Sequence, residues 1–203
     1  MERTKTYEEA LEDNPLRPFV RDRMEILPLA RAAKAGRIPK ALQVACARGD
    51  STAQLLGRFD IGELVAADKS EAMIELAKLR HPALATSFTV MDIPRLAFPD
   101  ASFDAVFNLA ELHNYADWRA GLAEMARVLK PGGLLVMDEL SAESFERGLG
   151  PYFKKRTAHP YEEMFTAESL RSALEGLGFS LTCYRTKNPL GLLPYLIVAA
   201  RKG

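Results

Sequence analysis

One carboxylate and one glycine have the spacing expected of a ribose-binding site. Asp68 ends the apolar run Leu64–Asp68 and follows Gly49 by 19 residues. Glycine lets the backbone approach a ligand closely, and a carboxylate at a strand end can accept hydrogen bonds from both hydroxyls of a ribose. We therefore expect Asp68 to hold a ribose. The alternative is that Asp68 only caps the next helix, a role for which Ser70 competes.

A histidine stands where it could accept a proton from a substrate. His113 lies in the segment Asn108–Tyr115, at the end of an apolar run. An imidazole can take a proton near neutral pH without prior rearrangement, so His113 is the candidate general base. The alternative is a residue that packs or orients the substrate. His81, His113 and His159 are far apart in the sequence and show no zinc spacing, so no metal is expected.

The apolar runs that must position these residues alternate with helical patterns. This alternation predicts crossover units and a parallel sheet, in an α/β fold. The predicted strands are Ala41–Ala45, Glu63–Ala67, Ser87–Met91, Phe103–Leu109, Leu134–Asp138, Phe179–Arg185 and Pro194–Arg201. The connection around Asn188–Gly191 is too short for a helical crossover, so the last two strands should be antiparallel.

Three helices are predicted between and after these strands. In Ser70–Arg80, Ser70 can cap the first turn, and the buried stripe is expected at Met73, Leu76 and Ala77. The second helix is Tyr115–Leu129, and the third begins at the cap Thr166, runs to Leu177 and is ended by Gly178. The run Arg127–Gly133 predicts a helix stopped by proline and glycine before a buried strand. Residues 1–39 are expected to form one or two helices, broken near Pro15 and Pro18.

Bulk composition excludes several classes of partner. The chain has 203 residues, 48% of them apolar, which suits one domain with a substantial core. Its 27 basic and 27 acidic residues give no electrostatic reason to expect nucleic acid or an anionic membrane. The longest apolar run, Leu192–Ala200, is too short to span a bilayer, and Met1–Asp13 does not have the pattern of a signal peptide. The two cysteines, Cys46 and Cys183, form no disulfide framework, so we expect a reducing cytoplasmic location.

Several of these segments together resemble the class I S-adenosylmethionine (SAM) methyltransferases, in the small-molecule branch typified by ubiquinone and menaquinone biosynthesis. Arg127–Gly133 resembles the element before the fifth strand of that family. The run from Asp92 to Asp104 resembles the family pattern Asp-x-x-x-Leu-Pro-Phe-x-Asp-x-Ser-Phe-Asp. The loop Ala45–Thr52 stands where the family has its glycine-rich cofactor loop. Only Gly49 of the usual three glycines is kept, and Gln43 replaces an acidic residue.

The resemblance implies a Rossmann-like sheet of seven strands, mostly parallel and closed by an antiparallel C-terminal hairpin. It also implies that SAM binds across the carboxyl ends of the strands, with Asp92 accepting a hydrogen bond from the adenine amino group. The segment Asn108–Tyr115 would run beside the methionine part of SAM, which makes His113 the expected catalytic residue. The expected cofactor-binding residues are Ala45, Cys46, Ala47, Gly49, Asp68, Lys69, Met73, Asp92, Ile93, Asn108 and Ala110.

We interpret residues 1–203 as a single methyltransferase domain. Residues 1–39 are expected to form an N-terminal helical cap, residues 40–140 the SAM-binding core, and residues 141–203 a substrate-side insert with the terminal hairpin. The two outer segments are expected to meet over the strand ends and enclose the acceptor, or else to cover an outer helix face. The apolar residues that suggest this contact are Tyr7, Leu11, Phe19, Val20, Phe145, Tyr152, Phe153, Tyr161 and Phe165.

The expected function is SAM-dependent methyl transfer to a small-molecule acceptor. The alternative is a methyltransferase-like binding or partner module that has lost turnover, which the substitutions at Gln43 and Ala47 would suit. A nicotinamide-dependent oxidoreductase is disfavoured because the Gly-x-Gly-x-x-Gly fingerprint is absent. The sequence leaves open the acceptor, the methylated atom and the oligomeric state.

Overall fold

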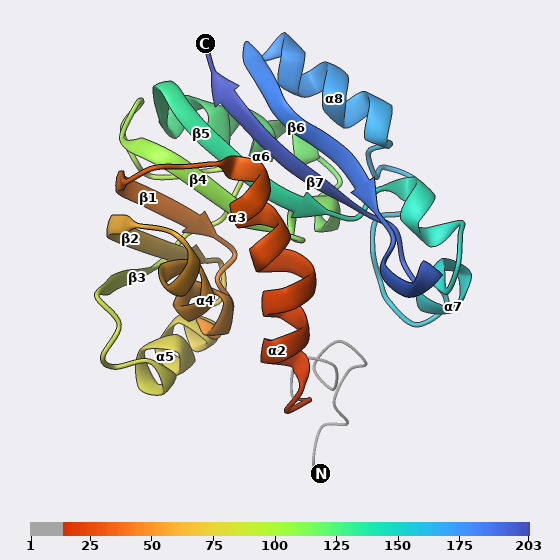
Figure 1. Ribbon diagram of the computed structural model, residues 1–203, viewed down its shortest axis with the longest axis horizontal. Helices are drawn as coiled ribbons and strands as arrows, with labels where there is room; N and C mark the ends of the chain where they lie inside the picture. Colours follow the sequence, from red (N-terminus) through yellow and green to blue (C-terminus); the bar gives the residue numbers. More distant parts are fainter. Residues whose placement is uncertain (1–13) are drawn as a thin grey trace.

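The alternating apolar runs and amphipathic helices form one twisted sheet covered by helices on both faces (Figure 1). The computed structural model describes residues 14–203. Its strands run in the order β3-β2-β1-β4-β5-β7-β6. They are β1 (Ile38–Val44), β2 (Ile61–Asp68), β3 (Thr86–Val90), β4 (Phe103–Leu109), β5 (Leu129–Glu139), β6 (Phe179–Lys187) and β7 (Tyr195–Lys202).

The strand directions confirm the predicted fold class. Strands β1 to β5 pair in parallel, whereas β7 lies between β5 and β6 and is antiparallel to both. The carboxyl ends of β1, β2, β4 and β5 therefore lie along one edge of the sheet. In an open α/β sheet, this is the edge at which ligands bind.

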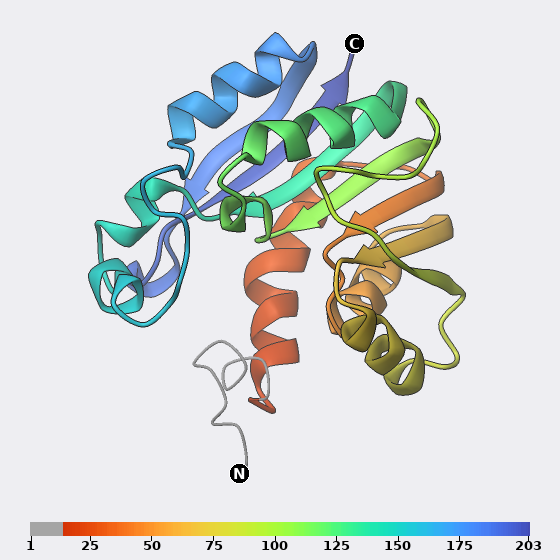
Figure 2. The ribbon, with the colours of Figure 1, turned by 180° about the vertical axis from the view of Figure 1, so that it is seen from behind.

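Successive residues of the central strands face two separate cores. Val106 and Met137 face the core under α6 (Trp118–Val128) and α8 (Ala167–Gly176), the helices in front in Figure 2. Phe107 and Val136 pack on the other side, toward α3 (Leu27–Ala33) and α4 (Asp50–Arg58). The remaining helices are α5 (Glu71–Arg80), α2 (Arg17–Arg21), the π-helical turn Asp22–Ile26, α7 (Gly150–Lys154) and the 3₁₀ turns Leu112–Asn114, Ala142–Phe145 and Pro189–Gly191.

The start of β5 differs from the prediction. It begins at Leu129 rather than Leu134, because the run around Gly132 forms a bulge inside the strand and does not precede it. Phe103 pairs with Leu129 and Ala105 with Leu134, so the extra residues are accommodated between these pairs. Gly132 has a φ of 75°, a conformation that glycine adopts without steric cost.

Two helix boundaries also need correction. Helix α6 begins at Trp118 rather than Tyr115, because a 3₁₀ turn precedes it and Asp117 caps its first turn. In the N-terminal segment, Pro18 lies in the first turn of α2, where a proline is tolerated, so it does not break the helix. Strand β1 begins at Ile38, three residues before the predicted start.

Helix α5 has the predicted cap but a different buried stripe. The Ser70 hydroxyl accepts a hydrogen bond from the backbone N–H of Met73 at 3.3 Å. The buried side chains are Ile74 and Ala77, whereas Met73 and Leu76 are half-buried. The stripe is rotated because Ile74 packs into the cluster beneath the loop that follows β1. For α8, the predicted cap at Thr166 is confirmed.

Arg127 joins the two sequence runs that carry the family resemblance. Its guanidinium donates to the carbonyl oxygens of Leu96 at 2.7 Å and Phe98 at 2.8 Å. It also contacts the carboxylates of Asp100 and Glu124, each at 2.7 Å. A planar guanidinium can make these bonds in several directions at once, so Arg127 fixes the 96–100 loop against α6.

We predict that Arg127→Lys lowers the free energy of unfolding by about 1–3 kcal/mol, because a lysine ammonium cannot reproduce the directed bonds to two carbonyls and two carboxylates. Urea denaturation measures the change. The matched control is Arg119→Lys in the same helix, where the arginine is exposed and lies over the ring of Trp118. Equal stability of the two variants would contradict this role for Arg127.

Candidate functional site

Three loops contact one another at the carboxyl edge of the sheet. The loop after β1 bonds to β2, since the N–H of Cys46 donates to the carbonyl of Ala67 at 2.9 Å. The loop after β4 bonds to β5 through the N–H of Ala110 and the carbonyl of Asp138, at 2.8 Å. Lys69, after β2, lies 3.8 Å from Glu111, after β4. The predicted residues of these loops are thus brought to one place.

The loop after β1 keeps a glycine-like backbone although two of its glycine positions hold alanine. Ala45 and Ala47 have φ values of 51° and 46°, and Ala110 at the end of β4 has a φ of 52°. Each non-glycine residue in this left-handed region costs about 1–2 kcal/mol. Such strain collects at ligand sites, and alanine adds only one carbon to the surface. The loop conformation therefore survives the loss of its glycines.

Gly49 and Gln43 secure the loop from beneath. A Cβ on Gly49 would lie 2.9 Å from the ring of His81 and 3.2 Å from Ala77, so this glycine lets α4 approach α5. Gln43 is fully buried, donates to the Ser51 hydroxyl at 2.8 Å and accepts from the Thr52 hydroxyl at 2.7 Å. An amide can donate and accept at once, which an ionised carboxylate cannot do.

Asp68 is held rigidly and still has acceptor capacity. Its Oδ2 accepts from the N–H of Ala47 at 2.8 Å, and its Oδ1 accepts from the N–H of Ser70 at 2.9 Å. Each carboxylate oxygen has a second lone pair that could accept from a ligand. Because the cap of α5 is Ser70, Asp68 does not serve as that cap.

Asp92 lies next to Tyr115 at the end of the run after β3. Its Oδ1 accepts from the N–H of Ile93 at 3.0 Å and from the Tyr115 hydroxyl at 2.6 Å. Burial and the hydrogen bond to Asp92 raise the pKa of Tyr115, so the phenol keeps its proton and donates a hydrogen bond to Asp92. The Lys69 ammonium lies 4.9 Å from the centre of the Tyr115 ring. These contacts place Asp92, Lys69 and Tyr115 together.

The other predicted cofactor residues differ in what they can present. Cys46 and Ile93 are buried, so they can reach a ligand only through their backbones. Burial, and secondarily the charge of Asp68, raises the pKa of the Cys46 thiol to about 12. Met73 is half-buried on the first turn of α5.

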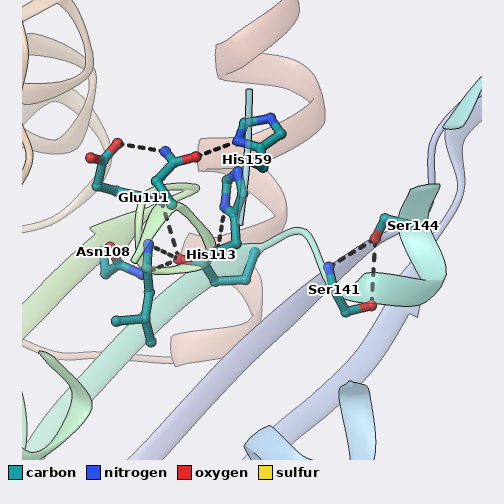
Figure 3. Close-up of polar contacts among 9 residues, drawn as sticks. Asn108, Glu111, His113, Ser141, Ser144 and His159 are labelled. Carbon is teal, nitrogen blue, oxygen red and sulfur yellow. Dashed lines mark hydrogen bonds and ion pairs between the residues drawn. The ribbon is translucent and has the colours of Figure 1, made fainter. Parts of the chain in front are cut away.

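The centre of the site is a buried carboxylate that the sequence interpretation missed. Glu139, at the end of β5, is 1% exposed and accepts from the backbone N–H groups of Glu111 at 3.2 Å and Leu112 at 2.8 Å. It also accepts a hydrogen bond from the Asn108 amide. Its second oxygen lies 2.8 Å from Nδ1 of His113 (Figure 3). The signal available in the sequence was an acidic residue directly after the fifth predicted strand.

The Glu139–His113 pair fixes the tautomer of the imidazole. Because the carboxylate accepts at Nδ1, that nitrogen carries the proton, and Nε2 is the nitrogen that can accept another. A carboxylate that orients an imidazole in this way is the arrangement used by general bases in acyl-transfer enzymes. His113 thus has the geometry of a general base.

A second histidine, which the sequence interpretation also missed, reaches the site from the 141–165 insert. The His159 ring meets the His113 ring edge-on at 5.0 Å, and its Nδ1 lies 2.6 Å from the Asn114 side-chain oxygen. Phe145 and Tyr161 lie 5.3 Å and 5.5 Å from the same ring. Burial, and secondarily His113, lowers the pKa of His159 to about 4, so it is neutral near pH 7.

Glu111 connects the two sides of this site. It accepts from the Asn114 amide at 3.1 Å and lies 3.8 Å from the Lys69 ammonium. Burial raises the pKa of Glu111 to about 7, although Lys69 and Asn114 oppose the shift. Asn114 bonds to both Glu111 and His159. Figure 3 shows Glu111 and His159 on opposite sides of this pair of bonds. The turn after β4 therefore contacts the loop after β2 and the insert.

The expected contact between the two outer segments stays a prediction. Tyr7 and Leu11 lie outside the described residues. Phe19 and Val20 are exposed on α2, and the adjoining Pro18 carbonyl accepts a hydrogen bond from Gln54 of α4 at 2.6 Å. Within residues 14–203, no three His, Cys, Asp or Glu side chains are grouped to hold a metal, and no helix could cross a membrane.

Comparisons with known proteins agree with this geometry. Residues 42–137 match the family model described as "Methyltransferase domain". A demethylmenaquinone methyltransferase of Deinococcus radiodurans is 43% identical over 102 residues, covering 49% of this chain and 42% of the relative. One from Beutenbergia cavernae is 35% identical over 150 residues, covering 68% and 61%. The chain thus spans about two fifths to three fifths of the length of these relatives.

A solved structure extends the likeness to the whole fold. One chain of the structure titled "Complex between the Haloferax volcanii Trm112 methyltransferase activator and the putative methyltransferase" has a TM-score of 0.75 and 17% identity, covering 98% of this chain and 99% of that one. At this identity the likeness concerns the fold alone. The matching family model and the sequence relatives support the resemblance to the class I SAM-dependent methyltransferases of the menaquinone-like branch, and the solved structure supports the fold.

Proposed function

We propose that the protein transfers the methyl group of SAM to a small molecule bound at the carboxyl edge of the sheet. The observation that carries the proposal is the meeting of the Asp68 loop with the Glu139–His113 pair at this edge. SAM supplies an electrophilic methyl group, so the protein has to align donor and acceptor and handle one proton.

The residues present fit SAM. In this proposal, Asp68 accepts from the ribose hydroxyls through the second lone pairs of its oxygens. Asp92 accepts from the adenine amino group through Oδ2, which accepts no hydrogen bond from residues 14–203. The left-handed alanines at 45, 47 and 110 let the backbone approach the ligand without a bulky side chain. The remaining contacts would come from Cys46, Gly49, Lys69, Met73, Ile93 and Asn108.

His113 would act as the general base for an acceptor that loses a proton. The acceptor O–H or N–H gives its proton to Nε2, while Glu139 holds Nδ1–H and stabilises the imidazolium that forms. Neutral His159, with Phe145 and Tyr161, covers the base and limits the access of water. An acceptor that is already anionic would need only alignment.

The acceptor would be chosen by parts of the chain outside the family model. The 141–165 insert contributes His159, Phe145 and Tyr161, and none of these lies within residues 42–137. The names of the relatives make demethylmenaquinone one acceptor to test first. The rival function is a binding or partner module without turnover, for which the alanine-substituted loop was the sequence argument.

The cofactor proposal predicts that Asp68→Ala weakens SAM binding by an order of magnitude or more. The two charge-assisted hydrogen bonds from the ribose hydroxyls to Asp68 are lost, each worth about 1.5–3 kcal/mol. The Ala47 N–H also loses its acceptor, which adds to the effect. Isothermal titration calorimetry measures the dissociation constant, and Asp60→Ala, at an exposed residue before β2, is the control. A wild-type protein that binds no SAM would favour the partner-module function.

The base proposal predicts that His113→Ala slows methyl transfer about 10²–10⁴-fold while SAM affinity is retained. Transfer is followed by the SAM-dependent appearance of methylated product with an acceptor that must lose a proton. A loss below tenfold would leave His113 as a packing or orienting residue.

A further inference from the structure

We propose that Glu111 senses the positive charge of the methyl donor, releasing a proton when SAM binds and recovering one after the sulfur has become neutral. The inference rests on the proposed function, because it assigns a role to Glu111 within the same cofactor site. It goes beyond that function by naming the group that distinguishes the charged donor from its uncharged product.

Glu111 lies between the proposed ribose site and the proposed base. Its carboxyl lies between Lys69, which follows the proposed ribose-binding Asp68, and the turn that carries His113. In SAM, the sulfonium sulfur is bonded both to the ribose and to the methyl group that faces the acceptor. A residue placed between the ribose site and the base is therefore placed along the sulfonium.

The groups around Glu111 have opposing effects on its ionisation. Lys69 and His113 favour its ionised form, and Glu139 of β5 disfavours it. The neighbouring amide of Asn114 donates to it, and Tyr115 feels its charge. On the far side, Asn114 is held by neutral His159. Lys69 is 3.8 Å away and 56% exposed, so solvent weakens its compensation of Glu111. The Glu111 side chain is 23% exposed, yet burial remains the largest influence on its pKa and raises it to about 7.

A cation added beside such a carboxyl favours its ionised form. SAM carries the sulfonium charge, whereas S-adenosylhomocysteine has a neutral thioether and the same amino-acid, ribose and adenine groups. The proton of Glu111 leaves to solvent when SAM binds. After methyl transfer the sulfur loses its charge, and the carboxyl can be protonated again. A protein group that contacts SAM and S-adenosylhomocysteine equally changes both affinities by the same factor. Its effect therefore cancels in the ratio of the two affinities.

The test is calorimetry of wild type with SAM and S-adenosylhomocysteine between pH 6 and pH 8. For a carboxyl with a pKa of about 7, the ionised fraction rises from about one tenth to about nine tenths over this range. The affinity for SAM relative to S-adenosylhomocysteine should therefore rise about tenfold. Titrations at pH 6 in two buffers of different ionisation enthalpy should show release of about 0.9 proton with SAM and little with the product.

Glu111→Gln keeps the size of the side chain and an oxygen for Asn114, and it should flatten the affinity ratio and abolish the proton release. Glu175→Gln, at an exposed position on α8, is the matched control and should behave as wild type. SAM binding with a pH-independent ratio would overturn the role of Glu111 and leave the proposed function intact. A pH-dependent ratio that persists in Glu111→Gln would also overturn it. Failure of wild type to bind SAM at all would overturn both.

Discussion

The buried carboxylate of Glu139 is the constraint on which the arrangement of the site depends. A carboxylate out of water needs donors, because an unpaired buried charge costs several kcal/mol. Here the donors are the Asn108 amide, the His113 ring and the backbone N–H groups that open the turn after β4. The hydrogen bonds to Glu139 therefore fix this turn. The turn then fixes His113, Glu111 and Asn114, which bonds to His159.

The residue before Glu139 shows what happens without donors. Asp138 points to the opposite face of β5, and its Oδ1 is buried and bonds to no residue among 14–203. Burial, reinforced by Glu25 and Glu139, raises its pKa well above the ordinary value despite Arg17 and Arg21. The uncharged form of this carboxyl is thereby favoured, since its buried oxygen lacks a hydrogen-bond donor. Two adjacent acids at one strand end therefore differ in their hydrogen bonding because strand alternation sends them to different surroundings.

The fold could be predicted because its signals are local. The strand β4 has the predicted bounds, and the caps at Ser70 and Thr166 follow from short-range patterns. The bulge at Gly132 was missed because a proline and two glycines also suit a simple helix stop. The pairs at the site could not be read in the same way, since Glu139 and His159 lie 26 and 46 residues beyond His113. Their contacts depend on the sheet order and on the path of the insert.

The turn Leu112–Asn114 and the preceding Glu111 connect the proposed cofactor side of the site with the proposed acceptor side. Glu111 and Asn114 bond to each other, so a shift of one displaces the other. Lys69 approaches this pair from the β2 side, and His159 approaches it from the insert. Movement of the insert against Asn114 would change the surroundings of Glu111 without touching the Asp68 loop. The proposed cofactor side and the proposed acceptor side of the site are therefore linked through two side chains, while the alanine-lined loop after β1 stays fixed by Gln43 and Gly49.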